Sequence, residues 1–419
     1  MGIISKLPSK SLTKKSAKAP HTNLSRYLLY TFVLAFVVLL FHQPHDDDAN
    51  NIDSLLLNHP STTTTTLPTS TSSSSNNNGS KLRFDWTNLA PQSPLTQRML
   101  AHQTNCSLPL GNFVYRNRFG LGSDLHIWGQ ALCNGMESRH RIRTVLPWTW
   151  MDQDKCGHLA SPMSCYFSKS ELNCEGDDAL ARQYPTFTNH WHNISKPKGN
   201  VNHKCDSIMN ATSKSDLRAS ATEFLFGQVS PLVVHEAERQ LALVFQTVGG
   251  QVPPDLITVH IRWGDKVDEM KLVPISDYIH AIQKVLDDRR RRRRNNNNND
   301  KKTAAANIFL ATEDPQALTE FQTLAPADWN IYVDQYYTDM LPYRVSDYNG
   351  SPKMSKQLHG RTGLVALGSL LVAMEANDFI LTTASNWSRL YNELRKSVLN
   401  PRCNDCTTMA DLRPVKNEF

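Results

Sequence analysis

The stretch Val259-His-Ile-Arg-Trp-Gly-Asp-Lys266 decides the fold class and points to a site. It closes an apolar run that begins at Leu256, is rich in β-branched residues and follows two prolines, so the pattern predicts a buried strand with a defined start. A histidine, an arginine, an aspartate and a lysine then arrive within seven residues, and Gly264 turns the chain. Charged groups at the carboxyl end of a buried strand lie where open α/β sheets bind ligands. An arginine there can form a bidentate fork on a phosphate.

Strands and helices alternate on both sides of this stretch, which predicts an α/β fold with parallel sheet covered on both faces. Downstream we expect strands at 307–312, 331–333 and 378–383, and helices at 275–286, 315–324, 364–376 and 388–396. Upstream, a strand at 113–115, a glycine turn at 120–126, a helix to residue 136 and a strand at 144–146 predict a second unit of the same kind.

The chain of 419 residues is long enough for two domains with sizeable cores. We place an acceptor-side Rossmann-like domain at 106–250 and a donor-binding Rossmann-like domain at 251–410. The arginine run 289–294 and the asparagine run 295–299 interrupt the second domain. We interpret them as a low-complexity surface loop; the alternatives are a site for an acidic partner and a cleavage site for a lumenal protease.

The N-terminal residues predict that the protein is located at a membrane. Residues 1–26 hold six basic residues and no acid, so subtracting six from the net charge of +6 leaves 27–419 neutral. A general nucleic-acid-binding function therefore loses its support. Residues 27–42 form an uncharged apolar run that we interpret as an uncleaved signal anchor, with a cleaved signal peptide as the rival. The charge before the run places 1–26 in the cytosol and the rest in the lumen.

Residues 43–105, rich in serine, threonine and asparagine, predict a flexible stem, with folded sequence beginning near Leu108. A lumenal position also suits eight cysteines and the six N-glycosylation triplets that follow the predicted anchor, at Asn78, Asn105, Asn193, Asn210, Asn349 and Asn386. Cys403 and Cys406 could indicate zinc or redox chemistry, but no second cysteine pair accompanies them, so we expect a local structural disulfide. The pairing of the other six cysteines stays open.

Polar residues follow several predicted strands: Arg262 and Asp265, then Glu313 and Asp314, then Ser385. Ser385 also precedes a helix, whose free amides and dipole favour an anion. Arg262 and the Ser385 turn could hold a diphosphate between them. Glu313 and Asp314 either contact a nucleoside or simply mark the start of a helix. Without a Walker loop or a dinucleotide glycine motif, kinases and dehydrogenases are disfavoured.

Four segments, in order, resemble the α-1,6-fucosyltransferases that core-fucosylate N-glycans. The stretch 259–266 resembles the family's His-Val-Arg-Arg-x-Asp-Lys peptide, and Ile308-Phe-Leu-Ala-Thr-Glu-Asp-Pro315 resembles its strand ending in two acids and proline. Residues 376–385, with Arg389, resemble its last donor-binding strand and turn. Gly120-Leu-Gly-Ser-Asp-Leu-His126 resembles its N-terminal glycine loop, with Gly120, Gly122 and His126 on the donor side.

The resemblance implies a GT-B fold, in which two Rossmann-like domains face a cleft, and inverting transfer from GDP-fucose without a metal or other cofactor. It implies that His260 and Asp378 contact guanine and that Arg262 and Ser385 hold the β-phosphate. Glu313 and Asp314 would line the nucleoside side, and Lys266 would take part in proton transfer. The partners would be GDP-fucose, a glycan or glycoprotein acceptor and a membrane, with no nucleic acid.

Two positions depart from the family pattern. Trp263 replaces a second arginine, which resembles protein O-fucosyltransferases with their single arginine. The expected catalytic glutamate is displaced by one, so that Glu269 is present and Met270 occupies its slot; Asp265 and Asp268 are the other candidate bases. We expect a Golgi membrane, single-pass fucosyltransferase with its catalytic part in the lumen. The alternatives are a protein O-fucosyltransferase and an inactive nucleotide-sugar-binding protein.

Overall fold

A computed structural model describes residues 82–115, 119–145, 147–177, 186–187, 213–268, 270–295, 305–340 and 350–415. Contacts separate residues 1–76 from residues 77–419, and all of the described residues belong to the second unit. Within the described ranges, no helix is long and apolar enough to cross a membrane. The predicted tail at 1–26 and the predicted anchor at 27–42 lie outside these ranges.

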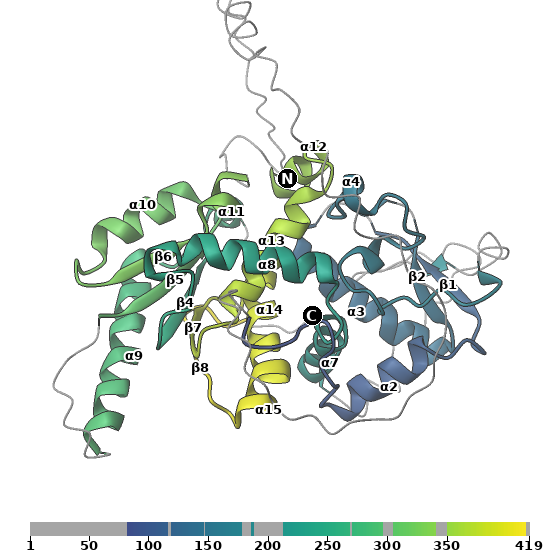
Figure 1. Cartoon of the computed structure of the whole chain (residues 1–419), viewed down its shortest axis with the longest axis horizontal. Coiled ribbons are helices and arrows are strands. Elements are labelled where there is room, and N and C mark those ends of the chain that lie inside the picture. Colours follow the sequence, from purple (N-terminus) through teal and green to yellow (C-terminus); the bar gives the residue numbers. More distant parts are fainter. Residues whose placement is uncertain are drawn as a thin grey trace, which may run out of the picture. The chain divides into compact units, whose positions relative to one another are not determined.

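The larger sheet has five parallel strands in the order β6-β5-β4-β7-β8 (Figure 1). Their bounds are β4 Leu256–Ile261, β5 Asn307–Thr312, β6 Asn330–Val333, β7 Asp378–Leu381 and β8 Thr408–Asp411. The predicted α/β class with parallel sheet is therefore confirmed, and four of these five strands fall where the sequence placed them.

Side chains alternate between the two faces along each strand, and both faces of this sheet present side chains that helices cover. Ile257 and Val259 of β4 pack in one apolar cluster with α9 (Ile275–Asn295) and α10 (Pro315–Leu324). On the other face, Thr258 Oγ1 donates a hydrogen bond to the Ala373 carbonyl of α13 (Arg361–Ala373), at 2.6 Å. His260 lies on that same face and contacts α14 (Asn386–Leu394).

The smaller sheet has three parallel strands in the order β2-β1-β3: β2 Arg141–Thr144, β1 Leu110–Phe113 and β3 Thr186–Phe187. Helix α3 (Leu121–Ser138) connects β1 to β2, so the predicted strand, turn, helix and strand are present. Both strands begin three residues before the predicted positions. For β2, the shift arises because the strand buries charged residues, which an apolar pattern does not predict. Arg141 is 2% exposed because Asp177 accepts from its guanidinium at 2.8 Å.

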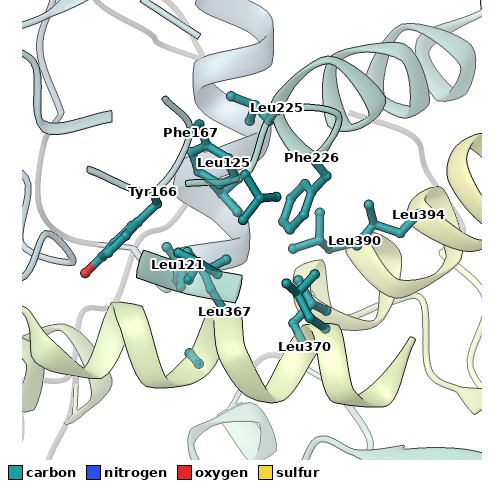
Figure 2. Packing of buried hydrophobic residues seen from close by; sticks show 14 of the residues in the cluster. Leu121, Leu125, Tyr166, Phe167, Leu225, Phe226, Leu367, Leu370, Leu390 and Leu394 are labelled. Atoms are coloured by element: carbon teal, nitrogen blue, oxygen red, sulfur yellow. The ribbon is translucent and has the colours of Figure 1, made fainter. Parts of the chain in front are cut away.

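One apolar core joins the elements of the two sheets (Figure 2). It contains side chains from α3, α13, α14 and α7 (Lys214–Phe226), and α8 (Pro231–Val244) packs along α13. The labelled leucines and Phe226 of Figure 2 show how these four helices meet: Leu121, Leu125, Leu225, Leu367, Leu370, Leu390 and Leu394. The two sheets are thus parts of one compact unit.

The folded chain begins earlier than the expected Leu108. Trp86 is fully buried, and α2 (Pro94–Gln103) packs against α7 and β2. Gln103, 1% exposed, donates to the Ile142 carbonyl at 3.1 Å. The predicted stem therefore cannot extend to residue 105. A few apolar side chains fix this mostly polar segment to the core. In the sequence, such a sparse apolar pattern looks like that of a linker.

The arginine run is helical, which corrects its prediction as a loop. Helix α9 continues through it to Asn295. Arg290 and Arg291 form ion pairs one turn back, with Asp287 at 3.0 Å and Asp288 at 3.6 Å. Arginine is a good helix former, and such pairs add a little support.

The remaining described elements are short: α4 Gln153–Cys156, η1 Pro162–Cys165, η2 Gln246–Val248, η3 Gly264–Asp268, α11 Gln335–Met340, α12 Gly350–Gln357, the π-helical η4 Arg395–Leu399 and α15 Asn400–Cys403. Disulfides join Cys106 to Cys174, Cys156 to Cys165 and Cys403 to Cys406, and Cys133 is also disulfide-bonded. The predicted local disulfide of the Cys-x-x-Cys segment is confirmed.

Candidate active site

The carboxyl edge of the larger sheet brings Arg262 and Glu313 together. Arg262 follows β4 and Glu313 follows β5, its hydrogen-bonded neighbour. Arg262 Nη1 lies 3.5 Å from Glu313 Oε2, and the two side chains are 13% and 19% exposed. Since parallel strands end at one edge, this ion pair follows directly from the topology. A partly exposed guanidinium is thus held where open α/β sheets bind ligands.

Tyr337 of α11 completes this group and was missed in the sequence. Its hydroxyl donates to Glu313 Oε1 at 2.9 Å, and the side chain is buried. Burial and the nearby Glu313 carboxylate raise the pKa of Tyr337 well above its usual value, so the phenol stays a donor. Asp334, the first residue after β6, positions it by accepting from the Tyr337 amide at 3.0 Å. The sequence signal that could have pointed to this group was Asp334, an acid directly after a predicted strand.

His260 lies beneath α14, where Ser388 holds it. Its Nδ1 and the Ser388 hydroxyl share a hydrogen bond of 2.6 Å, and its ring centroid lies 5.4 Å from that of Tyr391. The residue is 3% exposed. Burial, with a smaller contribution from the charge on Arg262, lowers the pKa of His260 to about 3, so the ring is neutral. In this arrangement His260 joins strand to helix, and its ring is covered.

The Ser385 turn meets the glycine loop of α3. Ser385 is the N-cap residue of α14 and is 1% exposed, and its amide donates to the Thr382 carbonyl at 2.9 Å. A Cβ on Gly122 would lie 3.0 Å from the Trp387 ring, so a glycine there permits close contact of α3 and α14. A Cβ on Gly120 would meet nothing within 4 Å. The predicted phosphate turn and glycine loop are therefore neighbours.

Asn386, one of the predicted glycosylation acceptors, is used in this contact. Its amide donates to Ser123 Oγ at 2.5 Å, and its carbonyl oxygen lies 3.3 Å from His126 Nδ1. The side chain therefore joins α14 to α3. An amide engaged in this way is a poor attachment point for a glycan.

His126 belongs to a buried polar network rather than to an open surface. Its Nε2 lies 2.8 Å from Glu393 Oε2. The same carboxylate accepts from Arg218 at 3.2 Å and from Thr222 at 3.0 Å. Burial alone would raise the pKa of Glu393, but the interactions with His126 and Arg218 outweigh it and lower the pKa. One ionised carboxylate thus joins α3, α7 and α14.

Two of the residues predicted to contact the donor, Asp314 and Asp378, form bonds within the protein. Asp314 caps α10, because its Oδ1 accepts from the amides of Gln316 at 2.8 Å and Ala317 at 3.0 Å. Asp378 begins β7 and pairs in register with Ile257, at the amino edge of the sheet. Arg262 follows the other end of β4, so the two residues lie at opposite edges of the sheet, and their joint contact with one nucleotide stays a prediction.

The loop after Arg262 is fixed by Trp263. The indole Nε1 donates to the Val273 carbonyl at 2.9 Å, and the ring packs against the core beside α9. Between these residues, η3 carries Asp265 and the partly exposed Lys266. The Asp265 side chain and the whole of Glu269 lie outside the described part of the structure. The tryptophan that departs from the family pattern therefore has a structural task.

This arrangement can bind an anion: a guanidinium oriented by a carboxylate, one strand away from a helix N-terminus with free amides. In the described ranges, no three His, Cys, Asp or Glu side chains are grouped so that they could hold a metal ion. Comparison with protein-family models and with curated proteins found no match to this chain.

Proposed function

We propose that the protein transfers fucose from GDP-fucose to a glycan acceptor with inversion, and that it is a GT-B enzyme of the Golgi lumen anchored by residues 27–42. The observation that carries this proposal is Arg262, held by Glu313 at the carboxyl edge of a parallel sheet, next to the turn that begins α14. The four-segment resemblance supplies the identity of the donor.

In the proposed reaction, the acceptor hydroxyl oxygen attacks C1 of fucose while the bond from C1 to the β-phosphate oxygen breaks. GDP leaves with the bonding electron pair, and the acceptor proton passes to a protein base. Arg262 would stabilise the charge that develops on the β-phosphate. Removal of one such donor typically costs about 10²- to 10³-fold in rate.

The direct test is Arg262→Ala in the purified full chain, assayed with labelled GDP-fucose against an array of glycans. We expect transfer to fall at least about 100-fold, because the alanine side chain cannot neutralise the charge on the leaving diphosphate. Arg290→Ala, on the exposed part of α9, is the matched control and should leave the rate unchanged. Full activity of Arg262→Ala would refute the donor assignment.

The base lies in the segment after Arg262. We expect Glu269→Gln to lose turnover while GDP still binds, because only proton transfer is removed. Binding is measured by isothermal titration, so that a folding defect is separated from a catalytic one. Unchanged turnover would move the role to Asp265 or Asp268.

A second candidate, protein O-fucosylation, is favoured by Trp263. Trp263 occupies the position of the second arginine and donates a hydrogen bond to the Val273 carbonyl, which fixes the loop. The motif therefore keeps one arginine. Offering folded protein domains beside the glycans distinguishes the two acceptor classes. Binding of GDP-fucose without transfer to either would identify an inactive nucleotide-sugar-binding protein.

A further inference from the structure

A second polar site lies apart from Arg262. A cleft of about 380 Å³ opens between α7 and α14 and reaches the turn after β7 and Ser93, the N-cap residue of α2. Arg262, Glu313 and Tyr337 do not line it. The proposed fucosyl transfer therefore leaves this cleft unexplained.

One face of α14 forms a wall of the cleft. Arg389, Asn392, Glu393 and Lys396 line it at the spacing that places residues on one side of a helix. The first turns of α7 form the opposite wall and contribute Arg218. Arg389 and Arg218 are each 8% exposed, and Glu393 is 7% exposed. Burying such charges is costly; Arg218 and Glu393 offset that cost by their ion pair at 3.2 Å, and Arg389 is the buried lining cation outside that pair.

The charge balance of the lining favours an anion. Three cations, Arg218, Arg389 and Lys396, face two acids, Asp216 and Glu393, so three minus two leaves +1. Glu393 already accepts from His126, Arg218 and Thr222, and Asp216 accepts from Ser213 at 2.7 Å. Both acids are thus engaged within the protein.

The other polar lining groups are hydroxyl and amide groups, including those of Ser220, Thr383, Asn392 and Ser397. The Thr383 and Ser397 hydroxyls donate within the protein, to Asp411 and to the Glu393 carbonyl. None of the described residues that line the cleft is aromatic. A neutral sugar would therefore find no ring to stack on. A guanidinium with surrounding hydroxyl groups suits the oxygen atoms of a phosphate or a carboxylate.

We propose that this cleft binds a small phosphate- or carboxylate-bearing ligand, with Arg389 as its main contact and Lys396 as a second. Arg389 also belongs to the segment that resembles the donor-binding turn, so the proposal is tested in a chain that lacks Arg262. Arginine at such a position gives bidentate recognition that lysine cannot reproduce.

The test uses the full chain with Arg262→Ala, so that the proposed donor site cannot account for the binding. Isothermal titration with inorganic phosphate, glucose 6-phosphate and glucuronate shows which chemistry is bound. We expect saturable binding of at least one ligand that weakens about tenfold in Arg389→Gln, the usual cost of a charge-assisted hydrogen bond. Arg290→Gln, outside the cleft, should leave the affinity unchanged.

Arg389 is buried, so its variant is checked by thermal melting. If Arg389→Gln does not fold, the exposed Lys396→Glu decides, because it reverses one lining charge at a position that tolerates it. We expect at least about tenfold weaker binding in that variant. Absence of saturable binding of all three ligands below millimolar concentrations, or unchanged affinity in Lys396→Glu, would overturn the proposal.

Discussion

The two edges of the larger sheet each carry an arginine–carboxylate pair, and the pairs differ. At the carboxyl edge, Arg262 and Glu313 approach to 3.5 Å with side chains 13% and 19% exposed. At the amino edge, Arg289 and Asp378 are directly hydrogen-bonded, their side chains are 15% and 7% exposed, and the Thr408 hydroxyl donates to the same carboxylate, so the pairs differ in the carboxylate and not in the burial of the arginine. Residue type alone therefore does not identify a site. The edge at which a pair lies, and how closely its carboxylate is bonded and enclosed, distinguishes the pair that we propose for binding from the pair that we expect to stabilise the fold.

The largest expected contrast is between Arg262→Ala and Arg289→Ala. Loss of Arg289 leaves a buried carboxylate without its cation, so we expect about 3 kcal/mol less stability. Transfer by the folded fraction should be unchanged, whereas Arg262→Ala should lose transfer and keep its stability. Denaturant unfolding and transfer assays on both variants measure this. If Arg289→Ala weakens GDP binding and lowers transfer by the same factor, the amino edge takes part in donor binding, and the proposed division between a stabilising edge and a binding edge is wrong.

A smaller contrast separates Asp378 from Glu313. We expect Asp378→Asn to cost about 1 to 2 kcal/mol of stability, because a donor amide then faces Arg289, with an unchanged KM for GDP-fucose. Glu313→Gln should instead keep its stability and lower transfer about tenfold, because it no longer orients Arg262. A raised KM in Asp378→Asn, measured at a temperature where the variant is folded, would restore Asp378 to the guanine site.

The last effect concerns Glu375, next to the amino edge, and shows only in the pH dependence of stability. Burial raises its pKa from 4.5 to about 7, against the lowering effect of Arg83. The folded state therefore binds the proton more tightly than the unfolded state. The resulting stabilisation is complete below pH 4.5 and is lost as the pH rises towards 7, at up to about 1.4 kcal/mol per pH unit.

Glu375→Gln should flatten this part of the stability profile, which unfolding at a series of pH values measures. Asp124, whose pKa burial raises to about 8, titrates in the same direction in both proteins. The difference between wild type and variant therefore isolates Glu375. Parallel profiles for the two proteins would contradict the expectation.

Sequence patterns predicted the larger sheet better than the smaller one. Strands β4 and β5 are apolar runs between turn residues, and such runs predict buried strands wherever both faces are covered. Strand β2 reads Arg-Ile-Arg-Thr, and its burial depends on Asp177, far along the chain, which no local pattern contains. Strand β8 was missed because its contacts are with distant residues, and helix α2 was missed although it carries a local start signal, the Ser93 cap followed by Pro94.

The site was predictable where topology alone places residues. Arg262 and Glu313 meet because each follows a strand of the same parallel pair. Asp378 begins β7, as the predicted strand 378–383 implies, and its contact with Arg289 arises from residues far apart in the sequence that no local pattern contains. Tyr337 was missed because its role arises from a hydrogen bond across the sheet edge.

Arg83 sets where a pulling force would enter the folded unit. Its amide donates to both Glu375 carboxylate oxygens, at 2.9 Å and 3.0 Å, and its guanidinium donates to Asn377 at 2.8 Å. Those partners directly precede β7, at the amino edge of the sheet. Tension on the N-terminal segment would therefore load these contacts first. The proposed anchor at residues 27–42 would thus transmit force to the amino edge, away from the opposite edge where Arg262 lies.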